Sequence, residues 1–309
     1  MITTVTLNAS IDKAYYMSDA IENGTVMRVR EVRNVAGGKG LNVAKVAHIC
    51  GEEIKVTGFV GGFNGQWLES MAANAGLITD FEHVSGETRS CVNILDPKFG
   101  STEYLEPGFE LSPEDIAKFM ARFPEIIRES SVVTMSGSAP RGVAKNIYGE
   151  LVRIIRETGK RVILDTSGEY LKLALLSEMK PNMIKPNKDE IEQITGIKPK
   201  TLDDVKGSAI LLHETGVEFV VVSLGSEGAL LACDDGVLIA RPPKLEAVNT
   251  VGCGDAMTGA FAVAMSRNLR PDEALRYAVA VSAASALSPD TGDFAPKNFD
   301  GIFPNVKIF

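Results

Sequence analysis

The chain has 309 residues, a length that suits one large domain or two small ones. Hydrophobic residues make up 45% of it, which is ordinary for a globular protein with a full core. The formal net charge of -8 argues against a nucleic-acid-binding protein, because no basic surplus is present to neutralise phosphates. A local basic pocket is still compatible with this charge.

The four cysteines are scattered, and none has the spacing of a metal site or a redox pair, so we expect reduced thiols in a cytoplasmic protein. The N-terminus has no basic segment before an apolar run, and no apolar stretch is long enough to cross a bilayer. We therefore expect neither a signal peptide nor a membrane partner.

The chain begins with a predicted strand over residues 2–7, where β-branched and apolar residues alternate. Asp12 follows shortly after this strand. In open α/β sheets, ligands bind beyond the carboxyl ends of the strands. Asp12 could therefore accept hydrogen bonds from sugar hydroxyls, although a plain turn aspartate fits the pattern equally well.

A glycine-rich segment, residues 36–42 (AGGKGLN), leads into a predicted helix over 41–50. It is not a Walker A loop, because no Lys-Ser or Lys-Thr pair ends it. Close backbone approach and the charge of Lys39 suit a phosphorylated or hydroxyl-rich ligand. A plain turn with a solvated lysine is the alternative.

Two segments carry hairpin signals in place of helices. Residues 13–35 contain short strand patterns around Asn23-Gly24, and residues 89–107 alternate on either side of a turn at 96–100. Such segments often pair as one small sheet that covers a site. Arg89, at the root of this sheet, could grip a phosphate with its guanidinium fork.

From residue 113 onward, helices and strands alternate regularly. Helices are predicted at 113–129, 145–158, 170–176, 202–215 and 272–288, and strands at 131–136, 161–165, 183–185 and 219–224. Buried apolar strands that alternate with helices predict a mostly parallel sheet with helices on both faces.

The most informative stretch is residues 248–260 (VNTVGCGDAMTGA), in which two glycines precede a predicted helix. A glycine-rich turn that enters a helix directs free N–H groups and the positive end of the helix dipole at one point, which favours an anion. Asp255 lies at this entrance, where a carboxylate could take a proton from an attacking hydroxyl. The same pattern also occurs in ordinary loops whose aspartate caps a helix.

Residues 36–42 (AGGKGLN) and 249–255 (NTVGCGD) closely resemble the two signature motifs of the ribokinase-like sugar kinases, also called the PfkB family. Residues 184–190 (IKPNKDE) and 223–229 (SLGSEGA) also match, in the order and spacing of that family. The resemblance therefore covers essentially the whole chain.

Three further segments resemble the branch that holds 1-phosphofructokinases and tagatose-6-phosphate kinases: 6–12 (TLNASID), 86–89 (GETR) and 136–140 (SGSAP). Departures from the usual pattern are Ala9 where proline is common, Met27 where asparagine is common, and Cys253 in the glycine turn. Only a backbone N–H is needed at Cys253, so we expect that residue to be compatible with catalysis.

The resemblance implies one ribokinase-like domain over residues 1–309. Its fold would be a three-layer α/β/α arrangement with a central, mostly parallel sheet and a small β-sheet lid from about 13–35 and 89–107. It also implies transfer of the γ-phosphoryl group of ATP to a sugar hydroxyl with Mg²⁺, with a monovalent cation as a further candidate. We expect a homodimer that pairs through the lid.

The resemblance also implies roles for individual residues. Asp255 matches the catalytic base, and the N–H groups of Gly252, Cys253 and Gly254 match the anion hole. Substrate contacts match Asp12, Gly38, Lys39, Asn42 and Arg89, with Arg28 and Ser138 near the sugar phosphate. ATP contacts match Lys185, Asn187, Ser223, Gly225 and Gly228, while Asn187 and Glu190 match the motif that organises Mg²⁺.

We expect a kinase for a ketohexose monophosphate, most specifically D-fructose 1-phosphate, phosphorylated to fructose 1,6-bisphosphate. The alternative substrate is tagatose 6-phosphate, phosphorylated on its 1-hydroxyl. A non-catalytic sugar-phosphate sensor is the alternative from another class, and Asp255, Asn187 and Glu190 argue against it. A dinucleotide-binding dehydrogenase is disfavoured, because no G-x-G-x-x-G segment follows the first strand.

Overall fold

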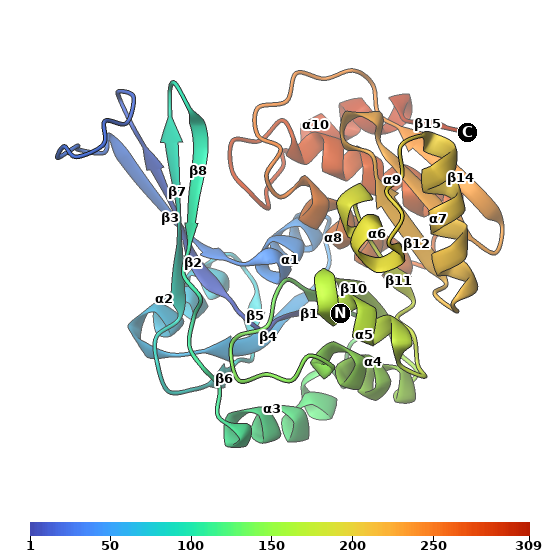
Figure 1. Cartoon of the computed structure of the whole chain (residues 1–309), viewed down its shortest axis with the longest axis horizontal. Helices are drawn as coiled ribbons and strands as arrows, with labels where there is room; N and C mark the ends of the chain where they lie inside the picture. The colour runs from blue at the N-terminus through green and yellow to red at the C-terminus, as the bar shows by residue number, and fades with distance from the viewer.

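The structure is a computed structural model that describes residues 1–309. Its main sheet has 11 strands in the order β15-β14-β13-β12-β11-β10-β9-β1-β4-β5, with β6 paired to β4 (Figure 1). In this sheet order, the strands that lie from β12 to β4 run parallel to one another. The strands β13, β14 and β15 at one edge are each antiparallel to their neighbours. The bounds are β1 Ile2–Thr6, β4 Ile54–Val60, β5 Ile78–Thr79, β6 Glu82–His83, β9 Val132–Ser136, β10 Arg161–Asp165, β11 Met183–Ile184, β12 Phe219–Ser223, β13 Ala229–Cys233, β14 Gly236–Arg241 and β15 Lys307–Ile308.

Helices cover both faces of this sheet, and its central strands are therefore buried on both sides. Alternate residues of one strand enter different cores, so Ile2 packs in one core and Val5 in the other. The first core is covered by α1 Lys39–Ile49, α2 Gly62–Asn74, α8 Cys253–Ser266, α9 Pro271–Ser285 and α10 Pro296–Ile302, and the second by α3 Pro113–Ile126, α4 Ile147–Glu157, α5 Gly168–Leu176, α6 Lys188–Thr195 and α7 Leu202–Glu214. The predicted three-layer α/β/α class is confirmed.

A separate sheet of four strands, in the order β3-β2-β7-β8, projects from one side of the molecule (Figure 1). Its strands are β2 Ser10–Tyr16, β3 Glu31–Gly37, β7 Arg89–Asp96 and β8 Gly100–Leu105. Ser10 on β2 pairs with Gly37 on one side and with Arg89 on the other. This register brings the glycine-rich segment and Arg89 to the same end of the small sheet, where it joins the main sheet.

The predicted turn at Asn23-Gly24 does not form a tight hairpin. The first strand ends at Tyr16 and the second begins opposite it at Glu31, so residues 17–30 form a long connection. The buried carboxylate of Asp96 accepts hydrogen bonds from the amides of Ile21, Lys98 and Phe99. The bond from Ile21 holds the connection against the end of the β7–β8 hairpin, and the other two lie within the turn of that hairpin.

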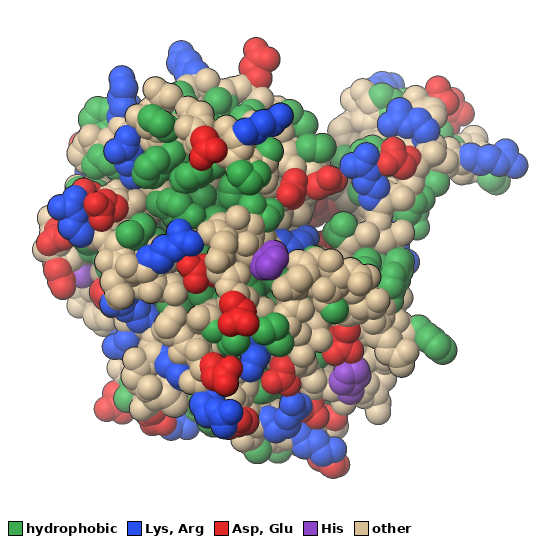
Figure 2. Space-filling model, turned by 180° about the vertical axis from the view of Figure 1, so that it is seen from behind, with side chains coloured by type: hydrophobic (Ala, Val, Ile, Leu, Met, Phe, Trp, Pro, Cys, Tyr) green, Lys and Arg blue, Asp and Glu red, His purple; other side chains and the backbone are tan.

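The rear face of the molecule shows positive and negative side chains interspersed, with no broad basic surface (Figure 2). This distribution agrees with the acidic net charge. The structure contains no helix with both the length and the apolar character that a membrane span requires.

Candidate active site

The candidate residues gather along one edge of the main sheet. Because β1, β9, β10, β11 and β12 are parallel, their carboxyl ends meet at this edge. Asp165 and Ser223 end two of these strands, and Asn8, Gly137 and Lys185 follow closely after the other three. The fold alone therefore brings the separate motifs of the sequence to a common region.

The entrance of α8 presents free backbone donors. Gly252 caps the helix with a φ of 83°, a left-handed conformation that favours glycine. The amides of Gly252, Gly254 and Asp255 have no acceptor within the chain, whereas the amide of Cys253 donates weakly to the Thr250 carbonyl at 3.4 Å. Free amides at the positive end of a helix dipole are suited to an anion.

Asp255 lies just inside this entrance and is only 7% exposed. Its Oδ2 accepts a hydrogen bond of 2.9 Å from Nδ2 of Asn42. Burial, with the nearby negative charge of Asp165, raises the pKa of Asp255 from its ordinary value of 3.8 to about 6, against the opposing effects of Asn42, Lys39 and Lys185. The carboxylate is therefore ionised at neutral pH and more basic than an exposed aspartate, as a general base requires.

Asp165, which the sequence analysis missed, lies at the centre of the charged cluster. It ends β10 and accepts a hydrogen bond of 3.0 Å from Oγ1 of Thr258. It also forms an ion pair of 3.5 Å with Nζ of Lys185. Asp165 is also the main cause that raises the pKa of Lys39, with Asp255 and Glu190 adding to it. An acid at the end of an apolar strand was the signal available in the sequence.

The glycine-rich segment lies directly against β1 and Asp12. A Cβ atom on Gly37 would stand 2.0 Å from Cγ of Asp12, and one on Gly40 would stand 2.2 Å from Oγ1 of Thr6. Only glycine permits this approach, which positions Asp12 beside the start of α1. Burial raises the pKa of Asp12, and a hydrogen bond of 2.6 Å from Oγ of Ser10 opposes that shift.

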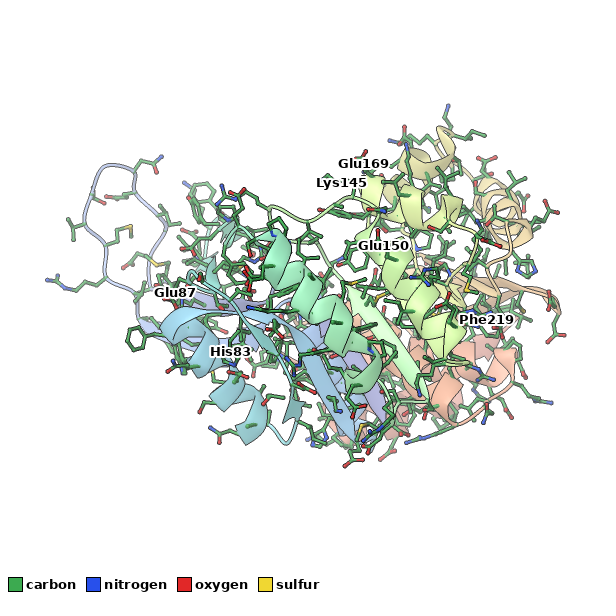
Figure 3. All side chains as sticks on the ribbon, turned by 90° about the horizontal axis from the view of Figure 1, so that it is seen from below. His83, Glu87, Lys145, Glu150, Glu169 and Phe219 are labelled. Atoms are coloured by element: carbon green, nitrogen blue, oxygen red, sulfur yellow. The ribbon has the colours of Figure 1, made fainter.

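Arg89 is held at the root of the small sheet by backbone carbonyls. Its Nε and Nη2 donate to the carbonyl of Asn8 at 3.2 and 3.0 Å, and its Nη1 donates to that of Glu106 at 3.1 Å. These bonds use three of the five guanidinium N–H donors, which leaves two for an anion. The two residues before Arg89 are also fixed. Oγ1 of Thr88 accepts a hydrogen bond from the Gly61 amide, and the carboxylate of Glu87 accepts one from the amide of Asn64 in α2 (Figure 3).

One predicted substrate residue lies far from Arg89, and another lies beside Lys39. Arg28 is exposed in the 17–30 connection, at the end of the small sheet opposite to Arg89. Six residue steps along β2, from Ser10 to Tyr16, separate the two ends, which corresponds to about 20 Å. Within one chain, Arg28 therefore cannot share a phosphate with Arg89, because the strand continues too far. Ser138 is exposed beside Gly137, where an added Cβ would lie 3.7 Å from Cβ of Lys39.

Asn187 and Glu190 form a reciprocal helix cap at the start of α6. Oδ1 of Asn187 accepts a bond from the Glu190 amide, and Oε2 of Glu190 accepts one from the Asn187 amide, both at 2.8 Å. No cluster of three or more acidic, histidine or cysteine side chains that could enclose a metal ion is present. The second oxygen of Glu190 has no partner in the chain, so the pair fits Mg²⁺ held mainly by water and phosphate.

The predicted ATP-binding turn lies at the end of β12, beyond β11 and Lys185. It forms a short 3₁₀ helix, η1 Gly225–Glu227, followed by Gly228 with a φ of 92°. A Cβ on Gly228 would stand 1.9 Å from the carbonyl oxygen of Ala240, so no larger residue fits. Ser223, Gly225 and Gly228 therefore lie together, two strands from Asp165.

The fold and this site define a phosphoryl-transfer enzyme of the α/β class, and comparison with known proteins identifies the family. The pfkB family carbohydrate kinase profile matches residues 5–298. A tagatose-6-phosphate kinase from Staphylococcus epidermidis is 34% identical over 311 residues, covering 100% of this chain and 99% of the relative. The chain belongs to the pfkB family of carbohydrate kinases.

Solved structures agree with this assignment. Phosphofructokinase-2 from Escherichia coli, in complex with potassium, has a TM-score of 0.91 and 28% identity over 98% of both chains. Other structures of that enzyme contain fructose-6-phosphate or are of a tetrameric inhibited form. A protein described as a possible 1-phosphofructokinase from Thermotoga maritima has a TM-score of 0.87 and 26% identity, covering 100% of this chain and 99% of that one.

Replacement of Asp255 by asparagine should stabilise the protein at high pH. The pKa of Asp255 is higher in the folded state than in the unfolded chain, so its ionised form opposes folding above about pH 6 and ceases to do so below its ordinary value. Asp255→Asn should gain up to roughly 3 kcal/mol in the free energy of unfolding near pH 8 and almost nothing near pH 4. Urea unfolding at both pH values measures this difference.

Asp203→Asn is the matched control, because the Asp203 side chain is 88% exposed. It should change the free energy of unfolding by no more than about 0.5 kcal/mol at either pH. A gain for Asp255→Asn that is equal at both pH values would show that the buried charge is not its cause.

Proposed function

We propose that this kinase transfers the γ-phosphoryl group of ATP to a ketohexose monophosphate. The observation that carries the proposal is the position of Asp255. It is a buried carboxylate with a raised pKa, beside three amides without acceptors. A base and an anion receptor at one helix entrance are what transfer to an alcohol requires.

In the proposed reaction, Asp255 removes the proton from the acceptor hydroxyl of the sugar. The oxygen of that hydroxyl attacks the γ-phosphorus of ATP, the bond from the γ-phosphorus to the β–γ bridging oxygen breaks, and ADP leaves. The free amides at the start of α8 receive the charge that develops on the phosphoryl oxygens. Lys39 and Lys185 add positive charge from either side of Asp165. Asn42 holds Asp255 in place through its 2.9 Å hydrogen bond.

ATP is proposed to lie over the carboxyl ends of β11 and β12, between Lys185 and the turn at Gly225–Glu227. Glu190 and Asn187 would hold Mg²⁺ through water. When bound, Mg²⁺ neutralises the phosphate oxygens, while the residues of this chain orient the reactants. We further propose that the whole chain acts as one kinase domain and that the small sheet is its lid, which excludes water from the transfer.

For the substrate we propose D-fructose 1-phosphate, phosphorylated on its 6-hydroxyl. The two spare donors of Arg89, together with Lys39, would bind the phosphate that the sugar already carries. The likeness to the Thermotoga maritima protein supports this choice. Tagatose 6-phosphate is the second candidate, supported by 34% identity to a tagatose-6-phosphate kinase. Both are ketohexose monophosphates and require the same cationic grip.

We also propose a homodimer that associates through the small sheet. The strand register aligns Tyr15, Val32, Ile94, Val92 and Tyr104 on one face, opposite to the face that contains Asp12 and Arg33. Val32 is 43% exposed and Tyr104 is 60% exposed. An exposed apolar face of this kind marks an interaction surface, and a second copy of the chain offers the same face.

ADP release across a panel of ketohexose monophosphates tests the proposed activity. We expect turnover with fructose 1-phosphate above tagatose 6-phosphate and above the unphosphorylated sugars. The acid limb of kcat/KM should have a pKa of about 6, because Asp255 must be ionised. Asp255→Asn should abolish turnover and still bind ATP. No release with any sugar phosphate would instead support the sensor.

Arg89→Ala should raise KM for the phosphosugar by about tenfold or more and leave KM for ATP nearly unchanged, because a charge-assisted phosphate contact is lost. Arg153→Ala is a matched control, since the Arg153 side chain is 56% exposed and pairs only with Glu157 on the same helix, α4. Equal effects of Arg89→Ala on both KM values would contradict a role in binding the sugar phosphate.

Sedimentation velocity tests the proposed dimer. The double variant Val32→Glu with Tyr104→Glu should shift a wild-type dimer to a monomer, because it places charges on the apolar face. Leu211→Glu on α7 is the control, because Leu211 is also exposed, at 54%, but lies on the far side of the molecule (Figure 1). A double variant that sediments like the wild type would exclude this face.

A further inference from the structure

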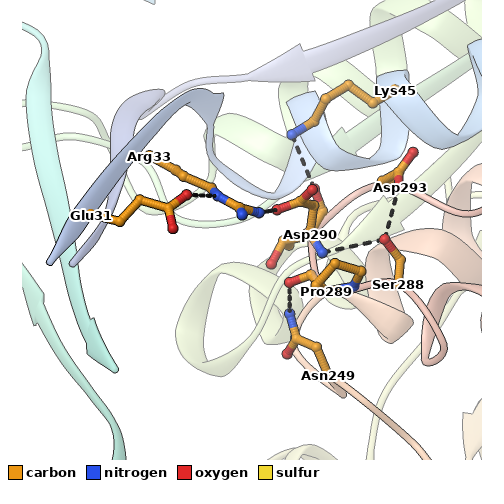
Figure 4. A network of polar contacts seen from close by, with 9 residues as sticks. Glu31, Arg33, Lys45, Asn249, Ser288, Pro289, Asp290 and Asp293 are labelled. Carbon is orange, nitrogen blue, oxygen red and sulfur yellow. Dashed lines mark hydrogen bonds and ion pairs between the residues drawn. The ribbon is translucent and has the colours of Figure 1, made fainter. Parts of the chain in front are cut away.

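Lys45 has no role in the proposed reaction, yet its side chain points into the same region. It lies on α1, one turn after Asn42, and therefore on the same helix face. Its Nζ donates to the carbonyl oxygen of Thr291 at 3.3 Å (Figure 4). This is its only hydrogen bond in the chain, so two of the three ammonium donors are left without a partner.

Four carboxylates from three parts of the fold surround this ammonium. Burial lowers the pKa of Lys45, and the charges of Asp12, Asp255, Asp293 and Asp290 oppose that shift, in that order. None of the four forms a direct ion pair with Lys45. Lys45 therefore interacts electrostatically both with the carboxylate proposed to bind the sugar and with the carboxylate proposed to act as base.

The carbonyl that Lys45 binds belongs to a turn, residues 288–293, which supports the entrance of α8. A Cβ on Gly252 would stand 2.5 Å from Cγ2 of Thr291, so the turn lies directly against the helix cap. Pro289 accepts a 3.1 Å hydrogen bond from Nδ2 of Asn249, at the start of the same motif (Figure 4). Displacement of this turn would therefore displace the amides of the anion hole.

The same turn also packs onto α1. A Cβ on Gly292, which has a φ of 72°, would stand 2.9 Å from Cε of Lys45 and 3.0 Å from Cα of Asn42. On the outer side of the turn, Asp290 forms a 3.1 Å ion pair with Arg33 of β3, and both side chains are about half exposed. The turn is thus held by an inner link to Lys45 and an outer link to the small sheet (Figure 4).

We propose that Lys45 is a positioning residue for phosphoryl transfer. Through Thr291 it fastens the 288–293 turn over α1 and so keeps Gly252 and Asp255 aligned with Asp12. Its charge also stabilises the ionised form of Asp255. The expected effect of Lys45 on kcat rests on the proposed function, whereas its expected effect on the pKa of Asp255 does not.

The experiment compares Lys45→Met, Lys45→Arg and Arg33→Met in the full chain. Steady-state assays give kcat and both KM values. Carboxyl ¹³C NMR of aspartate-labelled protein gives the pKa of Asp255, and Asp255→Asn identifies its resonance. The other charged or titratable groups around Asp255 stay constant across the variants: Lys39, Lys185, Asp165, Asp12, Cys253, Asp290 and Asp293.

Lys45→Met should lower kcat by about tenfold or more, with KM for ATP changed by less than about threefold. It should also raise the pKa of Asp255, because a positive charge that interacts with this carboxylate is lost, and move the acid limb to higher pH. Lys45→Arg should restore the wild-type pKa. Arg33→Met, which removes the exposed ion pairs of Arg33 with Asp290 and Glu31, should leave the pKa unchanged and kcat within about twofold.

Wild-type kcat in Lys45→Met, or an unchanged pKa of Asp255, would overturn the proposal. So would an Arg33→Met variant equal to Lys45→Met in both measurements. If Lys45→Met does not fold, Gly292→Ala takes its place. That variant keeps every charge but displaces the turn, so it should lower kcat without moving the pKa, and full kcat would contradict the proposal. If wild type has no turnover on any sugar phosphate, the proposed function fails, while the NMR titration still tests Lys45.

Discussion

The structure depends on one buried hydrogen bond, from Nδ2 of Asn42 on α1 to Oδ2 of Asp255 on α8. A buried carboxylate is costly unless it is paired, so these two helices are constrained to meet at one point. Close packing makes this contact possible, because an added Cβ on Gly259 of α8 would stand 2.8 Å from the carbonyl of Val43 on α1. The bond thereby joins the two glycine-rich entrances of the chain into one site.

Around this bond, positively and negatively charged side chains lie close together. Lys39 and Lys185 lie near Asp165, and Asp165 and Asp255 repel each other across the entrance of α8. This arrangement leaves Asp255 more basic than an isolated aspartate without preventing its ionisation at neutral pH. It also stores unfavourable energy in the folded state, which is common at sites whose chemistry requires a shifted pKa.

The small sheet and the 288–293 turn show how the site is completed by elements outside the main sheet. Both contact α1, and they contact each other through Arg33 and Asp290. The turn in addition supports the cap of α8, whereas the small sheet supplies Arg89. The proposed substrate contacts and the proposed receptor and base at the start of α8 therefore come from separate parts of the sequence that meet only in the folded chain.

The sequence by itself determined the alternation of strands and helices, the α/β class and the motifs that indicate the family, because these follow from local periodicity, glycine spacing and helix entrances. Through the family resemblance, it also indicated Asp255 as a base and Lys39 and Asn42 as substrate contacts. Tertiary structure alone decided the rest. The pairing of β2 with β3 ends at Tyr16 and Glu31, which leaves residues 17–30 as a long connection, bound to Asp96 through Ile21, and places Arg28 at the far end of the small sheet. Asp165 and Lys45 gain significance only from neighbours distant in sequence, since a buried charge is defined by what surrounds it, and local patterns contain no information about that environment.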